Sequence, residues 1–189
     1  MLANDVKEDK NMATKREQED PNYSEKVQKA LNKLISEEWL AGNTFMLFAS
    51  ALDRTDRNFT AVKDAFVDTA VDELQDHMKS MLDFALAYGY DIPSTFAEFK
   101  KHADKEDVKL FETFKKGKDS AHYLGLAIEA EKRAIKSYEE VMEGIDDLVL
   151  LPELQAVLKN NYYDEMEHLE SFNFLKYTID AQLDYGAED

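Results

Sequence analysis

The sequence predicts an all-α protein, a four-helix bundle with a long crossover between helices two and three that carries a short extra helix. Three observations predict this fold class. Apolar residues recur every three or four positions along four long segments. The 189 residues include only six Gly and three Pro, too few for a fold with many tight turns. The links after segments one and three are short, which makes consecutive helices antiparallel neighbours, whereas the link after segment two is long.

Each of the four long helices has recognisable ends. The first is predicted over 24–52, with Ser24 as N-cap, and the second over 58–88, ending before Gly89. The third is predicted over 120–144. The fourth is predicted over 152–185 and opens on a proline, which suits the first helical position. Lengths of roughly 25–33 residues correspond to rods of about 38–50 Å, which favours a bundle.

The remaining segments are predicted as follows. Residues 90–119 are too many for a hairpin link, and within them the pattern over 104–116 predicts the short amphipathic helix. Its apolar side consists of Val108, Leu110, Phe111 and Phe114. Residues 1–23 are rich in charged side chains, so we expect a disordered or extended tail there and a single bundle domain over 24–186.

Charge and composition exclude several classes of function. The chain has 40 Asp and Glu against 23 Lys and Arg, a formal net charge of −17. So acidic a chain repels nucleic-acid phosphates, and we expect no nucleic-acid partner. It has no cysteine, which excludes disulfides, thiolate-bound clusters and cysteine nucleophiles. No apolar run approaches the roughly 20 residues that span a bilayer, so we expect no membrane partner and a cytoplasmic location.

Each long helix has a glutamate where its apolar stripe predicts a core residue: Glu38, Glu73, Glu131 and Glu165. These lie 14, 15, 11 and 13 residues from the predicted helix starts, near the middle each time. Antiparallel helices place their midpoints at one level, so the four carboxylates are predicted to converge. A single such glutamate can extend to solvent or join an ion pair. Four without Lys or Arg at that level indicate a metal site, because uncompensated buried carboxylates are costly.

Histidines accompany two of the glutamates. Glu165 and His168 form a Glu-x-x-His unit whose spacing puts both side chains on one helix face. In helix two, Asp76 and His77 follow Glu73 by three and four residues, and either of them could be the ligand there. Carboxylates with one or two imidazoles suit iron, two ions per chain, with manganese or zinc as substitutes.

Spacing relates the two halves of the chain. Glu38 and Glu73 are 35 residues apart, and Glu131 and Glu165 are 34 apart, which predicts two helix pairs related by a pseudo-twofold axis. In helix three, Glu129 is an alternative to Glu131, but position 129 lies off the apolar stripe. We therefore expect Glu131 to face inward.

Three segments resemble bacterioferritins. Residues 31–43, LNKLISEEWLAGN, resemble the first-helix segment, with Glu38 at the metal-ligand position. Residues 71–77, VDELQDH, and 164–168, DEMEH, resemble the motifs of helices two and four. The chain is thus similar to the ferritin-like superfamily, closest to bacterioferritin and Dps-like ferritins with an intra-subunit di-iron site. The crossover helix resembles the mid-chain helix of the DNA-protecting mini-ferritins (Dps).

Two positions depart from the bacterioferritin pattern. A family-like Glu-x-x-His unit in helix two implies histidine at position 76, where this chain has Asp76, and the histidine is His77. The methionine that bacterioferritins use as haem ligand directly follows the helix-two glutamate, and here that residue is Leu74. The sequence therefore does not predict haem.

The resemblance and the predicted site imply a ferroxidase that oxidises Fe(II) with dioxygen or hydrogen peroxide. Its catalytic ligands would be Glu38, Glu73, Glu131, Glu165 and His168. Iron storage and detoxification in a ferritin-like shell, of use in oxidative stress, follow from the same resemblance, and we expect a homo-oligomer, either a shell or a dimer. The alternatives are a rubrerythrin-like di-iron or di-manganese oxidoreductase or peroxidase without storage, and a non-enzymatic helical module.

Overall fold

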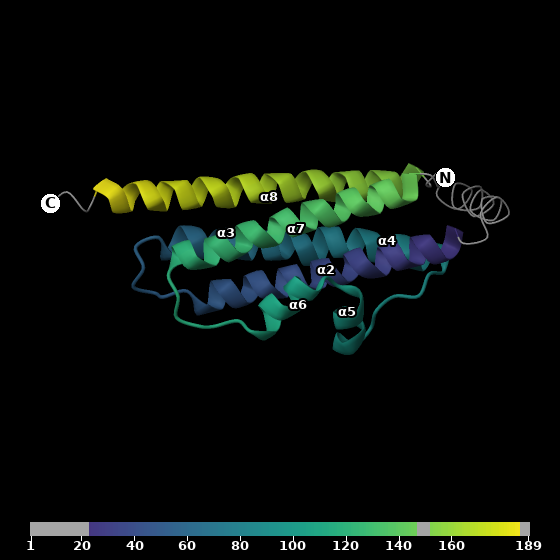
Figure 1. The fold of residues 1–189 in the computed structure, drawn as a ribbon, viewed down its shortest axis with the longest axis horizontal. Coiled ribbons are helices and arrows are strands. Elements are labelled where there is room, and N and C mark those ends of the chain that lie inside the picture. Colours follow the sequence, from purple (N-terminus) through teal and green to yellow (C-terminus); the bar gives the residue numbers. More distant parts are fainter. Residues whose placement is uncertain (1–22, 147–151, 186–189) are drawn as a thin grey trace.

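The structure, a computed structural model, describes residues 23–146 and 152–185. Every regular element in these ranges is a helix. Four long rods run along the longest axis of the molecule (Figure 1), so the predicted all-α bundle is confirmed. The tail predicted over 1–23 lies outside the described residues except for Tyr23, where the first helix begins.

Two pairs of rods build the bundle. Its rods are α2 (Tyr23–Ala51), a second rod made of α3 (Phe59–Val71), the π-helical segment η1 (Asp72–His77) and α4 (Met78–Tyr88), then α7 (Ser120–Asp146) and α8 (Pro152–Tyr185). The rod α2 packs along the second rod, and α7 packs along α8 (Figure 1). None of the described helices is both long and apolar enough to cross a membrane.

The crossover differs from the prediction because it contains two short helices, α5 (Phe96–His102) and α6 (Lys105–Glu112). Both lie against α2 (Figure 1). The unpredicted helix α5 begins with a capping box, in which Thr95 accepts a hydrogen bond from the Glu98 backbone and the Glu98 carboxylate accepts one from the Thr95 backbone. Its Phe99 ring stacks on Trp39 of α2 at 4.8 Å between centroids. This stack fastens the crossover to the bundle.

The core consists of two apolar clusters at different levels of the bundle. One contains Leu31, Leu34, Ile35, Met81, Phe84, Tyr138 and Leu158. The other contains Phe45, Phe48, Phe66, Tyr123, Ala127 and Phe172. On each rod, the mid-helix glutamate falls between the residues of these two clusters. A layer of ionisable side chains therefore separates the two apolar clusters.

The contact between α2 and η1 is close at Gly42. A Cβ atom on Gly42 would lie 2.6 Å from Cγ of Leu74 and 3.2 Å from the carbonyl oxygen of Ala70. We expect Gly42→Ala to lower the free energy of unfolding by about 1–3 kcal/mol, measured by urea denaturation. At Gly125 in α7 an added Cβ meets nothing within 4 Å, so Gly125→Ala should instead stabilise the helix by roughly 0.5–1 kcal/mol. Similar effects at both glycines would contradict the close approach.

Candidate metal centre

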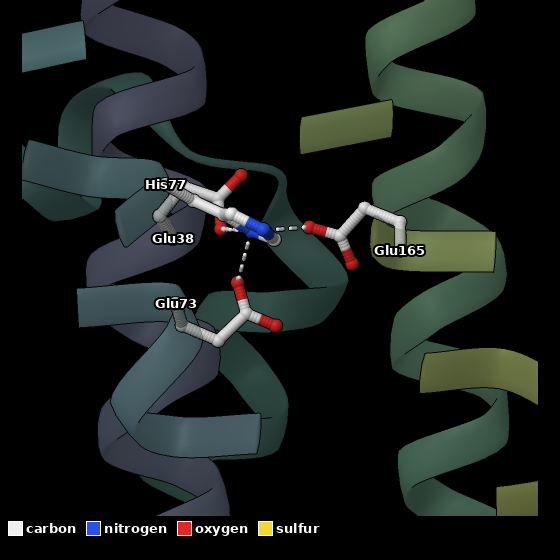
Figure 2. Close-up of side chains that lie close together, drawn as sticks. All are labelled: Glu38, Glu73, His77 and Glu165. Atoms are coloured by element: carbon white, nitrogen blue, oxygen red, sulfur yellow. Dashed lines mark hydrogen bonds and ion pairs between the residues drawn. The ribbon is translucent and has the colours of Figure 1, made fainter. Parts of the chain in front are cut away.

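Six ionisable side chains lie buried together in the layer between the apolar clusters. They are Glu38, Glu73, His77, Glu131, Glu165 and His168, and none is more than 9% exposed. All four rods contribute, so these residues, far apart in the sequence, meet only in the folded bundle. Figure 2 shows four of them, with the His77 ring directed at carboxylates from three different rods.

The possible ligand atoms form two groups of four, and within each group the atoms lie within 4.8 Å of one another. The first group consists of Glu38, Glu73, His77 and Glu165. The second consists of Glu73, Glu131, Glu165 and His168. The groups share Glu73 and Glu165, one carboxylate from each half of the chain. This arrangement offers two adjacent cation positions, each with its own histidine and its own glutamate, joined by two common carboxylates.

The π-helical segment selects the helix-two histidine. The backbone N–H of Met78 donates to the carbonyl oxygen of Glu73, five residues back instead of four. This wider turn takes up one additional residue, so the four-residue step from Glu73 to His77 leads back to the interior. Asp76 is exposed and belongs to neither group. Of the two alternatives, the structure therefore places His77, and not Asp76, among the possible ligands.

His77 is held by carboxylates on several sides. Its Nδ1 atom lies 3.2 Å from an oxygen of Glu73, 3.2 Å from one of Glu165 and 3.4 Å from one of Glu38 (Figure 2). The Nδ1 atom of His168 likewise lies 3.6 Å from Glu73 and 3.9 Å from Glu165. Each imidazole thus directs its Nδ1 atom at the shared carboxylates of Glu73 and Glu165.

Two aspartates orient the histidines from outside. His77 Nε2 lies 3.4 Å from Oδ2 of Asp164, and His168 Nε2 lies 3.3 Å from Oδ2 of Asp72. Each aspartate directly precedes a shared glutamate and contacts the histidine of the other rod. Carboxylates in this position fix the ring orientation and leave the inner nitrogen for a metal. Helical periodicity does not reveal this role, although the Asp-Glu pair repeated at 72–73 and 164–165 is a sequence signal for it.

The predicted pseudo-twofold relation between the two halves does not extend to the residues beside Glu38 and Glu131. Tyr138 lies seven residues after Glu131, and its hydroxyl donates a hydrogen bond to Glu38. The Tyr138 oxygen also accepts one from Asn161 Nδ2 at 3.0 Å. The equivalent residue after Glu38 is Phe45, which has no hydroxyl to offer Glu131. The Glu38 carboxylate therefore has a hydroxyl donor that the Glu131 carboxylate lacks.

Several buried polar atoms of this layer have no hydrogen-bond partner among the described residues. These atoms are Oε1 of Glu73, Oε1 of Glu131, both oxygens of Glu165 and Nδ1 of His168. Buried polar atoms are ordinarily satisfied, and an orphan points to an ion or water. A cation shared by these oxygen and nitrogen donors would satisfy all of them, so the residues present fit a bound metal.

The inner carboxyls titrate abnormally. Burial, with the charge of the adjacent Glu73, raises the pKa of Glu38 to about 8. Burial, with the charges of Glu165 and Glu73, raises the pKa of Glu131 well above its usual range. Burial opposes the charged form of His168 too, but attraction to the Glu73 and Glu165 carboxylates together outweighs it and raises the pKa of His168 to about 9. Without metal, the buried groups therefore stay protonated, and these protons reduce the negative charge that a bound cation would compensate.

These shifts predict how the stability of the metal-free protein depends on pH. In the folded protein, Glu38 and His168 have higher pKa values than their ordinary values of 4.5 and 6.5, so the folded state binds their protons more tightly than the unfolded state. Their contribution is thus complete below those values and is lost as the pH rises through about 8 and about 9. We expect the Tm of metal-free protein to fall between pH 6 and pH 9, measured by differential scanning calorimetry.

Bound metal should remove this fall, because metal binding releases the same protons and strengthens as the pH rises. The control is therefore the same pH series with Zn(II) present. A Tm that rises with pH in the metal-free protein would contradict the assigned shifts.

A four-helix bundle with a long central crossover and carboxylates and histidines inside defines the ferritin-like class of helical proteins. The chain belongs to this family, since the family model for the ferritin-like domain matches residues 28–176. A comparison with curated proteins gives no match.

Proposed function

We propose that the protein is a ferroxidase that binds two Fe(II) ions per chain and oxidises them with dioxygen or hydrogen peroxide. The observation that carries this proposal is the pair of donor groups sharing Glu73 and Glu165. Carboxylates shared by two neighbouring ions suit two-electron chemistry. Oxygen and imidazole donors without thiolate suit iron, with manganese or zinc as substitutes. The bacterioferritin-like motifs around Glu38, Glu73 and Glu165 support the same reaction.

The substrates are two Fe(II) ions, which give one electron each, so that dioxygen is reduced to hydrogen peroxide or peroxide to water. The chain's own residues prepare the site for this. Glu73 and Glu165 draw the ions together, and Tyr138 fixes Glu38. Asp72 and Asp164 hold the outer nitrogens of the two histidines, and both are about half exposed. They can therefore exchange protons with solvent while the apolar clusters exclude bulk water.

We also propose that copies of the chain associate, as storage of iron in a shell requires. Apolar side chains are exposed along one face of α8: Tyr163, Met166, Phe174 and Tyr177. Exposed apolar patches of this kind mark protein–protein contacts. The net charge of −17 would concentrate cations around such an assembly.

Anaerobic loading with Fe(II) followed by rapid mixing with dioxygen or peroxide tests the reaction. We expect ferric absorbance to form faster than in buffer and to saturate at two Fe(II) per chain. Oxidation no faster than in buffer with either oxidant would refute the ferroxidase. Light scattering during iron loading separates the variants of the proposal: a large particle with many ions per chain supports storage, and a dimer with two ions per chain supports a rubrerythrin-like oxidoreductase.

A further inference from the structure

A basic groove lies between the first half of α2, the end of α5 and the last turns of α7. Its volume is about 550 Å³. The charged and titratable side chains that line it are Lys26, Lys29, Lys33, Lys101, His102 and Glu140. Four ammonium groups thus gather around one hollow of a chain whose net charge is −17.

Local structure brings the lysines together. Lys26, Lys29 and Lys33 follow one another by three and four residues, so they lie on one face of α2. Helix α5 carries Lys101, and the stack of Phe99 on Trp39 holds that helix against α2. The crossover, whose helix α5 was not predicted from the sequence, therefore completes the groove.

Two of these lysines pair with no carboxylate in the part of the chain that the structure describes. Lys33 Nζ lies 3.5 Å from a carboxylate oxygen of Glu140 and 3.9 Å from one of Glu37, so its charge is compensated. Over residues 23–146 and 152–185, no carboxylate lies within 4.0 Å of the ammonium of Lys29 or of Lys101. Like charges placed together repel one another unless an anion joins them. Within residues 23–146 and 152–185, the groove accordingly presents the positive charge of Lys29 and Lys101 without a paired carboxylate.

We propose that this groove binds a small, multiply charged oxyanion of the phosphate or polycarboxylate class. Lysine ammonium groups on flexible stems bind such anions as point charges. The volume falls within the roughly 300–1,000 Å³ of small-molecule sites. An extended nucleic acid does not fit this proposal, because it would reach beyond the screening distance of about 8–10 Å into the acidic remainder of the surface. The inference is independent of the proposed ferroxidase reaction.

Titration of the metal-free, full-length protein with sodium pyrophosphate, and in a second arm with sodium citrate, tests the site. Trp39 is the only tryptophan and stacks on the helix that carries Lys101, so its fluorescence can report binding. Isothermal titration calorimetry at constant ionic strength is a readout that does not depend on Trp39. We expect saturable binding of one anion per chain that weakens as salt is added.

Matched double variants distinguish anion binding in the groove from nonspecific attraction to lysines elsewhere on the surface. Lys29→Ala with Lys101→Ala should weaken binding by at least about tenfold, because two charged contacts are lost. Lys63→Ala with Lys159→Ala removes the same charge away from the groove and should bind like wild type. Tighter binding of pyrophosphate than of citrate, or the reverse, supports the site and identifies its ligand class. The proposal is overturned if neither anion binds saturably, or if both double variants bind equally well.

Discussion

His77→Ala is expected to slow Fe(II) oxidation by at least about a hundredfold, while Asp76→Ala retains the wild-type rate. The two residues are neighbours in sequence, but the π turn directs His77 to the shared carboxylates and leaves Asp76 in solvent. Loss of an outer partner of a metal ligand typically costs about 10- to 100-fold, so loss of the ligand itself should cost more. The effect should be large because His77 is the only imidazole of its donor group.

Stopped-flow absorbance after anaerobic loading measures this difference. His77→Gln serves as a second variant, because it preserves most of the buried volume if alanine perturbs folding. Circular dichroism should show that all three variants remain helical. Slow oxidation in Asp76→Ala together with a normal rate in His77→Ala would show that the helix-two ligand has been assigned to the wrong residue.

Glu131→Gln is expected to stabilise the metal-free protein and to reduce the stabilisation that bound metal provides. Without metal at pH 9, the wild type must bury an uncompensated carboxylate or hold its proton, whereas glutamine is neutral at any pH. The variant should then be more stable by about 1–4 kcal/mol. With metal, two ions at a hundred times their Kd should stabilise the wild type by roughly 5 kcal/mol, or about 10–20 °C in Tm. The variant lacks one donor of the second group, so its gain should be no more than about half of that.

Differential scanning calorimetry with and without anaerobic Fe(II) measures both effects. Glu129→Gln is the matched control, because Glu129 lies two residues away, is exposed and pairs with Lys132 at 2.7 Å. It should alter neither the metal-free Tm nor the metal-induced shift appreciably. If Glu129→Gln rather than Glu131→Gln reduced the metal-induced shift, the orientation of α7 would be wrong.

Much of the fold and site could be predicted because apolar residues recur at regular helical spacing along the sequence. A stripe of apolar residues at helical spacing specifies which face of a rod turns inward, whatever its partner is. A glutamate within that stripe, as at Glu38 or Glu131, is therefore placed in the interior by its own helix. Short links then align the rods, and the common mid-helix level of the four glutamates brings them together. The same reasoning predicts that Glu131 faces the interior and Glu129 does not, without knowledge of the neighbouring helices.

Tertiary structure decided what periodicity does not encode. The choice of His77 over Asp76 depends on a π turn, which forms where α2 packs closely at Gly42 and which no regular 3.6-residue pattern can anticipate. The contacts of Asp164 with His77 and of Asp72 with His168 cross between rods, so they exist only once two helices are docked. Likewise, Lys101 joins Lys29 only because α5 folds back and stacks on Trp39. Local spacing specifies the face of a helix, but packing between helices specifies which side chains meet.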